Sequence, residues 1–150
     1  MVQRLSRLRR KKCLRRIIVA AMAAAVIFGI AALRHRATPE RGIKTNEDRV
    51  EYLEKLGWSV DPEPLSITQL LLPDPFPEAL KEYNRLQQRQ GFDLEKLAGE
   101  NVTMYTYHVR NLPEDPNAQC SLYVYKDRIA GGDIHSVALD GFMWEMKPMG

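Results

Sequence analysis

The fold of this chain is decided by residues 119–136, which read QCSLYVYKDRIAGGDIHS. Two runs rich in β-branched and aromatic side chains, 119–125 and 128–136, are separated by Lys126-Asp127. This pattern predicts a β-hairpin with a two-residue turn. Three cross-strand pairs follow from the expected register: Val124–Ile129, Leu122–Gly131 and Cys120–Asp133.

Two more strands are expected upstream of the hairpin. Residues 65–72 (LSITQLLL) are apolar and bounded by prolines, and residues 102–109 (VTMYTYHV) are rich in Thr and Tyr. Both compositions favour extended backbone. The polar, proline-containing segment 112–118 is expected to be a loop.

Two amphipathic helices complete the predicted domain. The first is capped by Thr45, with Asp48 in the position of a capping box, and it ends before Gly57. The second opens near Pro77 and ends before Gly91. Each glycine is followed by a large aromatic residue, which is typical of a Schellman C-cap. The expected class is α+β: a small antiparallel sheet of three to four strands, with the two helices packed on one face.

The N-terminal segment predicts a membrane anchor. Residues 17–33 (IIVAAMAAAVIFGIAAL) carry no charged or strongly polar side chain, and a helix of this length spans about 26 Å of a hydrocarbon core of about 30 Å. Eight Lys/Arg precede this run, and three follow it up to Arg41. By the positive-inside rule, the N-terminus stays in the cytoplasm. The expected organisation is a basic cytoplasmic leader (1–16), a transmembrane signal anchor (17–33), a linker (34–45) and an extracytoplasmic domain (46–147).

Two other interpretations of the apolar run stay open. Gly29-Ile30-Ala31 has the small-x-small pattern that signal peptidases cleave, and cleavage near Ala31 would release a secreted domain. An Arg-rich leader without acidic residues is also found in mitochondrial presequences, although this apolar run is not amphipathic. In the anchored form, the lipid bilayer holds residues 17–33 and the basic leader binds anionic lipid headgroups.

The net charge of +3 hides two opposite segments. Residues 1–36 contain ten Lys/Arg and no Asp/Glu, whereas residues 37–150 contain twelve Lys/Arg and nineteen Asp/Glu, a net charge of −7. Because the part expected to fold is acidic, we expect no nucleic-acid partner. The expected location is the cell membrane, with a single span, a cytoplasmic N-terminus and an extracellular C-terminal domain.

Four tyrosines are the candidate interaction surface. Tyr105, Tyr107, Tyr123 and Tyr125 fall on strand positions of matching parity, so they are expected to share one face of the sheet. Exposed tyrosines favour contact with a protein or peptide partner. The same side chains would otherwise serve as cross-strand pairs that hold the sheet together.

The sequence supports a catalytic site or a metal site less well than it supports the tyrosine surface. Cys120 with His108 or His135 would make a thiol or hydrolase-type enzyme, but its alternation with apolar neighbours favours a buried thiol. Asp133 and His135 share one face of a strand, as metal ligands often do, with Asp140 as a third candidate in a turn. No convincing third ligand is evident, so we assign no catalytic residue, metal or cofactor.

The glycine pair before Asp133 has two possible roles. Gly131-Gly132-Asp133 would form an anion-binding nest, or the glycines would permit close packing of the backbone against a neighbouring element. Neither a lysine nor a helix start follows, as a phosphate-binding loop would need. We therefore favour close packing.

Three segments of the chain are distinctive: the pattern Gln-x-x-Gln-Gly-Phe-Asp-Leu at 87–94, Gly-Gly-Asp-Ile at 131–134, and RVEYLEKLGWSVDPEP at 49–64. On these segments, residues 49–143 resemble a bacterial family known as domain of unknown function 4830. The resemblance implies a short protein of clostridia-like bacteria with one N-terminal membrane segment, and it supplies no catalytic residues. Members usually have an Asn-Gly-like turn where this chain has Lys126-Asp127.

The expected function is that of a non-catalytic binding module. Topology, an acidic domain and the tyrosine surface together indicate a protein of the bacterial envelope that binds another, unknown envelope protein.

Overall fold

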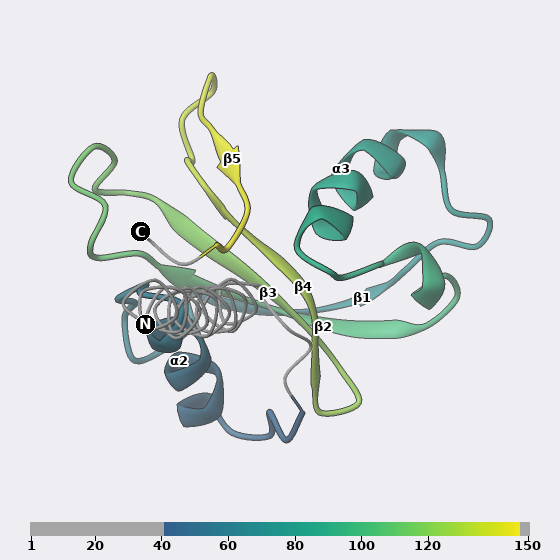
Figure 1. Cartoon of the computed structure of the whole chain (residues 1–150), viewed down its shortest axis with the longest axis horizontal. Helices are drawn as coiled ribbons and strands as arrows, with labels where there is room; N and C mark the ends of the chain where they lie inside the picture. The colour runs from purple at the N-terminus through teal and green to yellow at the C-terminus, as the bar shows by residue number, and fades with distance from the viewer. Residues whose placement is uncertain (1–40, 148–150) are drawn as a thin grey trace, which may run out of the picture. The chain divides into compact units, whose positions relative to one another are not determined.

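The computed structural model describes residues 41–147, and Figure 1 shows how their helices and strands are arranged. The elements follow in the order α2 (Asn46–Lys55), β1 (Ser66–Leu71), α3 (Glu78–Arg89), the 3-10 helix η1 (Glu95–Leu97), β2 (Asn101–His108), β3 (Gln119–Tyr125), β4 (Arg128–His135) and β5 (Met143–Trp144). The predicted leader and anchor lie outside the described residues. Between residues 41 and 147, no helix is both long and apolar enough to cross a membrane.

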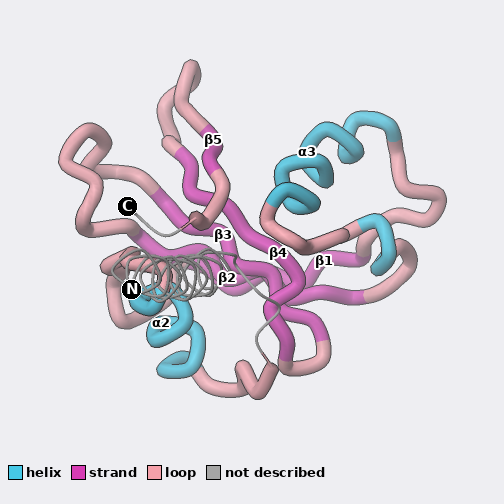
Figure 2. The backbone as a smooth tube through the Cα atoms, viewed as in Figure 1, coloured by secondary structure: helices cyan, strands magenta, loops and turns pink. Residues whose placement is uncertain are grey.

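The sheet is an antiparallel meander. Its five strands lie in the order β1-β2-β3-β4-β5, so each strand pairs with its neighbour in the sequence (Figure 2). The α+β class is therefore confirmed. The strand that sequence reasoning missed is β5, which has only two residues and is too short to give a periodic pattern.

The β3–β4 hairpin forms around the predicted turn, but its register differs. Lys126 and Asp127 adopt φ values of +46° and +58°, as both central residues of a type I′ turn do. Val124 faces Ile129 as expected, whereas Leu122 faces Gly132 and Cys120 faces Ile134. The expected partners of Leu122 and Cys120 were wrong because Ala130 is an extra residue in a β-bulge, which shifts the pairing by one.

The two helices lie on opposite faces of the sheet, which corrects the prediction that both pack on one face (Figure 1). Tyr52 and Leu53 of α2 belong to a core cluster with Cys120 and Leu122, whose side chains lie on what we call the α2 face. The second cluster includes Tyr83 of α3.

That second cluster covers the α3 face. It joins Tyr83 with Val102 and Tyr125, and Leu94 from the segment after α3 also belongs to it. The central strands carry large apolar or aromatic side chains on both faces of the sheet. Each face must therefore be buried by a separate helix.

The N-cap of α2 and the C-caps of both helices form as the sequence predicts. Thr45 and Asp48 make a reciprocal capping box at the start of α2. Gly57 and Gly91 have φ values of +90° and +93°, and the amide of Phe92 donates to the carbonyl of Gln87 at 3.0 Å. This last bond is the long-range bond of a Schellman motif.

Gln87 of α3 and Gln90, the C-cap residue of this helix, join α3 to the outer edge of β4. Gln87 Oε1 accepts a hydrogen bond from the Gly132 amide at 2.9 Å, and Gln90 Nε2 donates to the Gly132 carbonyl at 2.9 Å. Gly132 lies just beyond the point where β5 stops pairing with Ile134. The glutamine side chains therefore replace a strand at this position, and we call this arrangement the glutamine clamp.

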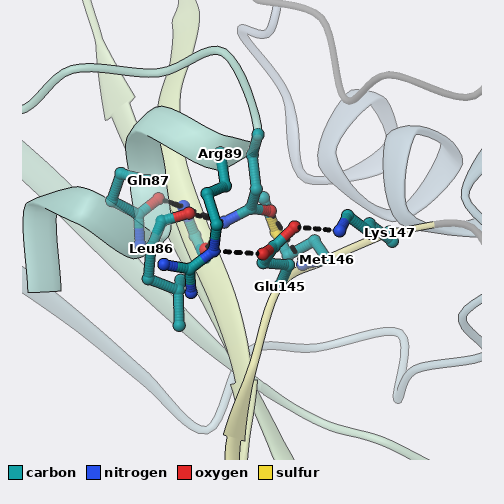
Figure 3. A network of polar contacts seen from close by, with 8 residues as sticks. Leu86, Gln87, Arg89, Glu145, Met146 and Lys147 are labelled. Atoms are coloured by element: carbon teal, nitrogen blue, oxygen red, sulfur yellow. Dashed lines mark hydrogen bonds and ion pairs between the residues drawn. The ribbon is translucent and has the colours of Figure 1, made fainter.

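The clamp also fixes the C-terminal segment (Figure 3). Gln90 Oε1 accepts from the Met146 amide at 2.8 Å, and Arg89 forms an ion pair with Glu145 at 2.6 Å. Met146 is fully buried. A Cβ atom on Gly132 would lie 2.5 Å from the Ser121 carbonyl oxygen and 2.4 Å from the Met146 sulfur. Because the Ser121 oxygen belongs to the backbone of the neighbouring strand, a side chain at residue 132 would force the strands or the C-terminal segment to shift. The close-packing reading of the glycine pair is thereby confirmed.

Replacing Gln87 by leucine should destabilise the domain by about 1–3 kcal/mol, because the buried Gly132 amide would lose its only side-chain partner. Thermal unfolding of the purified full chain, followed by circular dichroism, measures the change. Gln88→Leu is the matched control, since Gln88 is exposed on the same helix. Equal melting temperatures for the two variants would contradict the role given to the clamp.

Candidate functional site

The four predicted tyrosines do not share one face. Tyr105 pairs with Leu122 and Tyr107 with Cys120, which places both on the α2 face. Tyr123 and Tyr125 lie on the α3 face, where Tyr123 makes an edge-to-face contact with Tyr83 at 6.2 Å. The register therefore divides the predicted tyrosine surface into two separate pairs.

The tyrosine pair of the α2 face surrounds a buried arginine. Tyr107 is fully buried, and its hydroxyl accepts from Arg49 Nε and donates to Asn46 Oδ1, both at 2.9 Å. The Arg49 guanidinium lies 3.7 Å from the ring centroid of Tyr105, in the geometry of a cation–π contact. These tyrosines hold α2 against the sheet.

Cys120 is placed where it cannot act as a nucleophile. Its side chain is fully buried on the α2 face, and burial raises the pKa of its thiol well above the ordinary value. His108 and His135 both lie opposite Gln119, the residue before Cys120, and therefore on the other face. The structure contradicts the thiol-enzyme alternative, because the thiol and the imidazoles are on opposite sides of the sheet.

Asp133 and His135 do come together, with Tyr83 as a third member that sequence reasoning missed. Asp133 is buried; its Oδ1 lies 2.7 Å from His135 Nδ1, and its Oδ2 accepts from the Tyr83 hydroxyl at 2.5 Å. Burial and the neighbouring carboxylate raise the pKa of Tyr83 far above its ordinary range, so the phenol remains a donor. Both carboxylate oxygens are thus occupied by protein groups.

This arrangement does not resemble a metal site. Among residues 41–147, no three His, Cys, Asp or Glu side chains converge on a common point. Asp140 lies in the exposed loop between β4 and β5 rather than beside His135. His108 is held separately, with Nδ1 3.2 Å from Asp61 and Nε2 2.8 Å from the Pro116 carbonyl. Asp133 therefore connects Tyr83 of α3 to His135 of β4 and helps to hold the helix in place.

Among residues 41–147, no strand or loop forms backbone hydrogen bonds with the outer edge of β1. The Leu72 amide donates to Glu100 at 3.0 Å, in line with the β1–β2 register. Because alternate residues of a strand point their backbone groups in opposite directions, those of Ile67, Gln69 and Leu71 point away from β2. No other strand between residues 41 and 147 pairs with that edge.

Apolar side chains follow the same edge. Leu65, Ile67 and Leu71 are exposed to 55%, 61% and 66%, and with Gln69 they alternate along one face of the strand. We call Leu65, Ile67, Gln69 and Leu71 the β1 edge surface. Natural edge strands are usually protected by lysine, proline or a bulge, yet residues 66–71 contain neither a charge nor a proline.

A second group of exposed apolar side chains lies at the β4–β5 hairpin. Leu139 is fully exposed, and Trp144, exposed to 45%, stacks on Phe142 at 3.8 Å between ring centroids. This hairpin offers side chains but only a two-residue edge. The β1 edge surface combines open backbone groups with apolar side chains, so it is the better-formed binding site.

The Asp133–His135 pair should make stability depend on pH. The hydrogen bond to Asp133 raises the pKa of His135, while partial burial opposes the shift. A raised folded-state pKa gives a stabilisation that is complete below the unfolded value of about 6.5 and is lost as pH rises through the folded value. The deficit in unfolding free energy of His135→Asn should therefore be larger at about pH 5.5 than at about pH 8.5.

Urea unfolding of the full chain at both pH values measures this deficit. Asp133→Asn provides the control, because without the carboxylate the His135 pKa returns toward its ordinary value and most of the pH dependence disappears. An NMR titration in which His135 has the same pKa in the wild type and in Asp133→Asn would count against the proposed pairing.

Comparison with known proteins identifies one relationship. Residues 52–134 match the model of the family described as Domain of unknown function (DUF4830), which is more than half of the chain. The matched range contains α3, the glutamine clamp and the β1 edge surface, and it ends before β5. Searches of curated proteins and of solved structures find no match. The chain therefore belongs to the DUF4830 family.

Proposed function

We propose that this chain is a single-pass, membrane-anchored binding module of the bacterial envelope, and that it binds an envelope protein by strand addition at the β1 edge surface. Support for the anchor comes from the sequence: residues 17–33 are apolar, and eight Lys/Arg precede them. Support for binding comes from the open edge of β1. The open edge is the observation that carries the proposal.

The chemistry of the edge defines the partner. An extended segment placed beside β1 would pair its backbone with the outward groups of Ile67, Gln69 and Leu71. Its side chains at alternate positions would cover the exposed apolar row. Because residues 65–72 are uncharged, the partner segment should be apolar and uncharged as well, since a charge placed there would be desolvated without a counter-charge.

The test places a photo-crosslinking residue at Leu65 of the full chain, expressed in its native cells. This residue should capture one partner protein. The same residue in place of the exposed Gln88 should capture none. Gln69→Pro should abolish capture, because proline removes an outward amide without removing a hydrogen bond to β2. Gln69→Thr keeps the amide and should retain capture.

Three results would contradict the proposal. Capture that survives Gln69→Pro would show that backbone pairing at the edge is not required. A product of twice the mass of this chain would assign the edge to a second copy rather than to another envelope protein. A reporter fused after Gly150 that is active only in the cytoplasm would contradict the membrane topology.

A further inference from the structure

The turn between β3 and β4 gathers basic side chains from two parts of the chain. The amides of Gly42 and Ile43 donate to the Asp127 carbonyl at 2.9 and 3.1 Å, and Arg41 forms an isolated β-bridge with Arg128. These bonds fix the start of the described chain against the hairpin turn. Four cations surround the open hollow of about 400 Å³ that results: Arg41, Lys44, Lys126 and Arg128. We call them the basic turn cluster.

The four cations of the cluster have no ion-paired carboxylate in the described chain, although Lys126 lies over the Tyr125 ring at 4.6 Å from its centroid. Asp127 is the only acidic residue that lines the hollow, and among residues 41–147 no carboxylate forms an ion pair with any of the four. The remaining eight Lys and Arg residues of that range are all engaged. Seven of them, from Lys55 to Lys147, pair with carboxylates, and Arg49 binds two tyrosines.

This concentration of charge stands out on an acidic domain. Residues 41–147 contain twelve Lys/Arg and eighteen Asp/Glu, so the domain as a whole carries a net charge of −6. Four cations beside one carboxylate, that of Asp127, leave an excess of positive charge in the hollow. The repulsion among the cations is relieved when an anion binds. Most of the remaining surface would be repelled by the same anion, so the cluster would also determine the orientation of the domain.

The position of the cluster in the chain indicates which anion is within reach. The predicted anchor ends at Leu33, eight residues before Arg41. Even a fully extended chain of this length spans at most about 28 Å. If residues 17–33 cross the bilayer, Arg41 and the hairpin turn it contacts are tethered close to the lipid headgroups. Electrostatic attraction to a surface acts within a Debye length of about 8 Å. A tether this short allows the basic turn cluster to come that close to the lipid headgroups.

We propose that the basic turn cluster binds the phosphate groups of anionic lipids at the outer membrane surface and thereby holds the domain with its β3–β4 turn toward the bilayer. This inference rests on the proposed membrane anchor. Binding is electrostatic and reversible: the Lys and Arg side chains replace the counterions of several lipid phosphates.

Paramagnetic relaxation of backbone amides tests the orientation. The full chain would be placed in nanodiscs of phosphatidylcholine, with or without phosphatidylglycerol, each containing traces of a lipid with a gadolinium-chelating headgroup. With phosphatidylglycerol, the amides of residues 126–128 should relax at least about tenfold faster than those of Glu114, Asp115 and Asn117, because the seven residues of β3 separate these ends by about 23 Å. Without it, the difference should largely disappear.

Charge-reversal variants show whether the cluster is responsible. Lys126→Glu combined with Arg128→Glu should abolish the difference. Lys81→Glu combined with Arg85→Glu is the matched control, since these residues are ion-paired on α3, and it should leave the difference unchanged.

Three outcomes would overturn the inference. Equal relaxation at both ends of β3 in both lipid mixtures would overturn it while leaving the anchor intact. Loss of the difference on addition of millimolar inorganic phosphate to anionic discs, at constant ionic strength, would assign the hollow to free phosphate rather than lipid. A chain that is not retained by the discs would show that the anchor itself is wrong, and the inference would fail with it.

Discussion

The structure depends on two glutamines at the C-terminal end of α3, one in the helix and one at its C-cap, that bind the backbone of one glycine. Gly132 presents its amide and carbonyl at the outer edge of β4, where β5 has already ended, and Gln87 and Gln90 satisfy both groups. Each side chain is buried, so water cannot replace it. A buried backbone group without a partner costs about 1–3 kcal/mol. Because the two glutamines provide those partners, β5 can end after two residues without leaving the backbone of Gly132 unpaired.

Several other features follow from the clamp. Holding the end of α3 at the β4 edge places Tyr83 over Asp133, and Oε1 of the Gln90 side chain accepts from the Met146 amide and so positions Met146. Within residues 41–147, the sheet therefore has one edge closed by side chains and one edge, that of β1, which is open. A binding module needs such asymmetry, because an open edge at both sides would favour association of copies into larger sheets.

Much of the fold could be predicted because local signals are strong. The capping box of Thr45 and the glycine C-caps at Gly57 and Gly91 appear as expected. The face of each tyrosine could not be predicted, because it depends on pairing register: Tyr105 and Tyr123 have the same parity, but Tyr105 lies opposite Leu122. A difference of one residue in register exchanges the two faces of a strand.

The candidate sites were harder to predict than the fold, for the same reason. The Gln-x-x-Gln-Gly-Phe-Asp-Leu and Gly-Gly-Asp-Ile segments carry the resemblance to the family, but nothing in either segment indicates that they bind each other across about 45 residues. Likewise, only the hairpin brings Arg41 beside Arg128. The open edge of β1 could not be predicted from the sequence, because it depends on which strand has no further neighbour between residues 41 and 147.

Hydrogen exchange at single amides tests most directly the claim that one edge of the sheet is closed and the other open. In the full chain, the account predicts slow exchange for Gly132, which donates to a buried glutamine, and for Thr68 and Leu70, which point toward β2. The outward amides of Ile67, Gln69 and Leu71 should exchange much faster. Slow exchange along both edges of β1, or fast exchange at Gly132, would contradict the account.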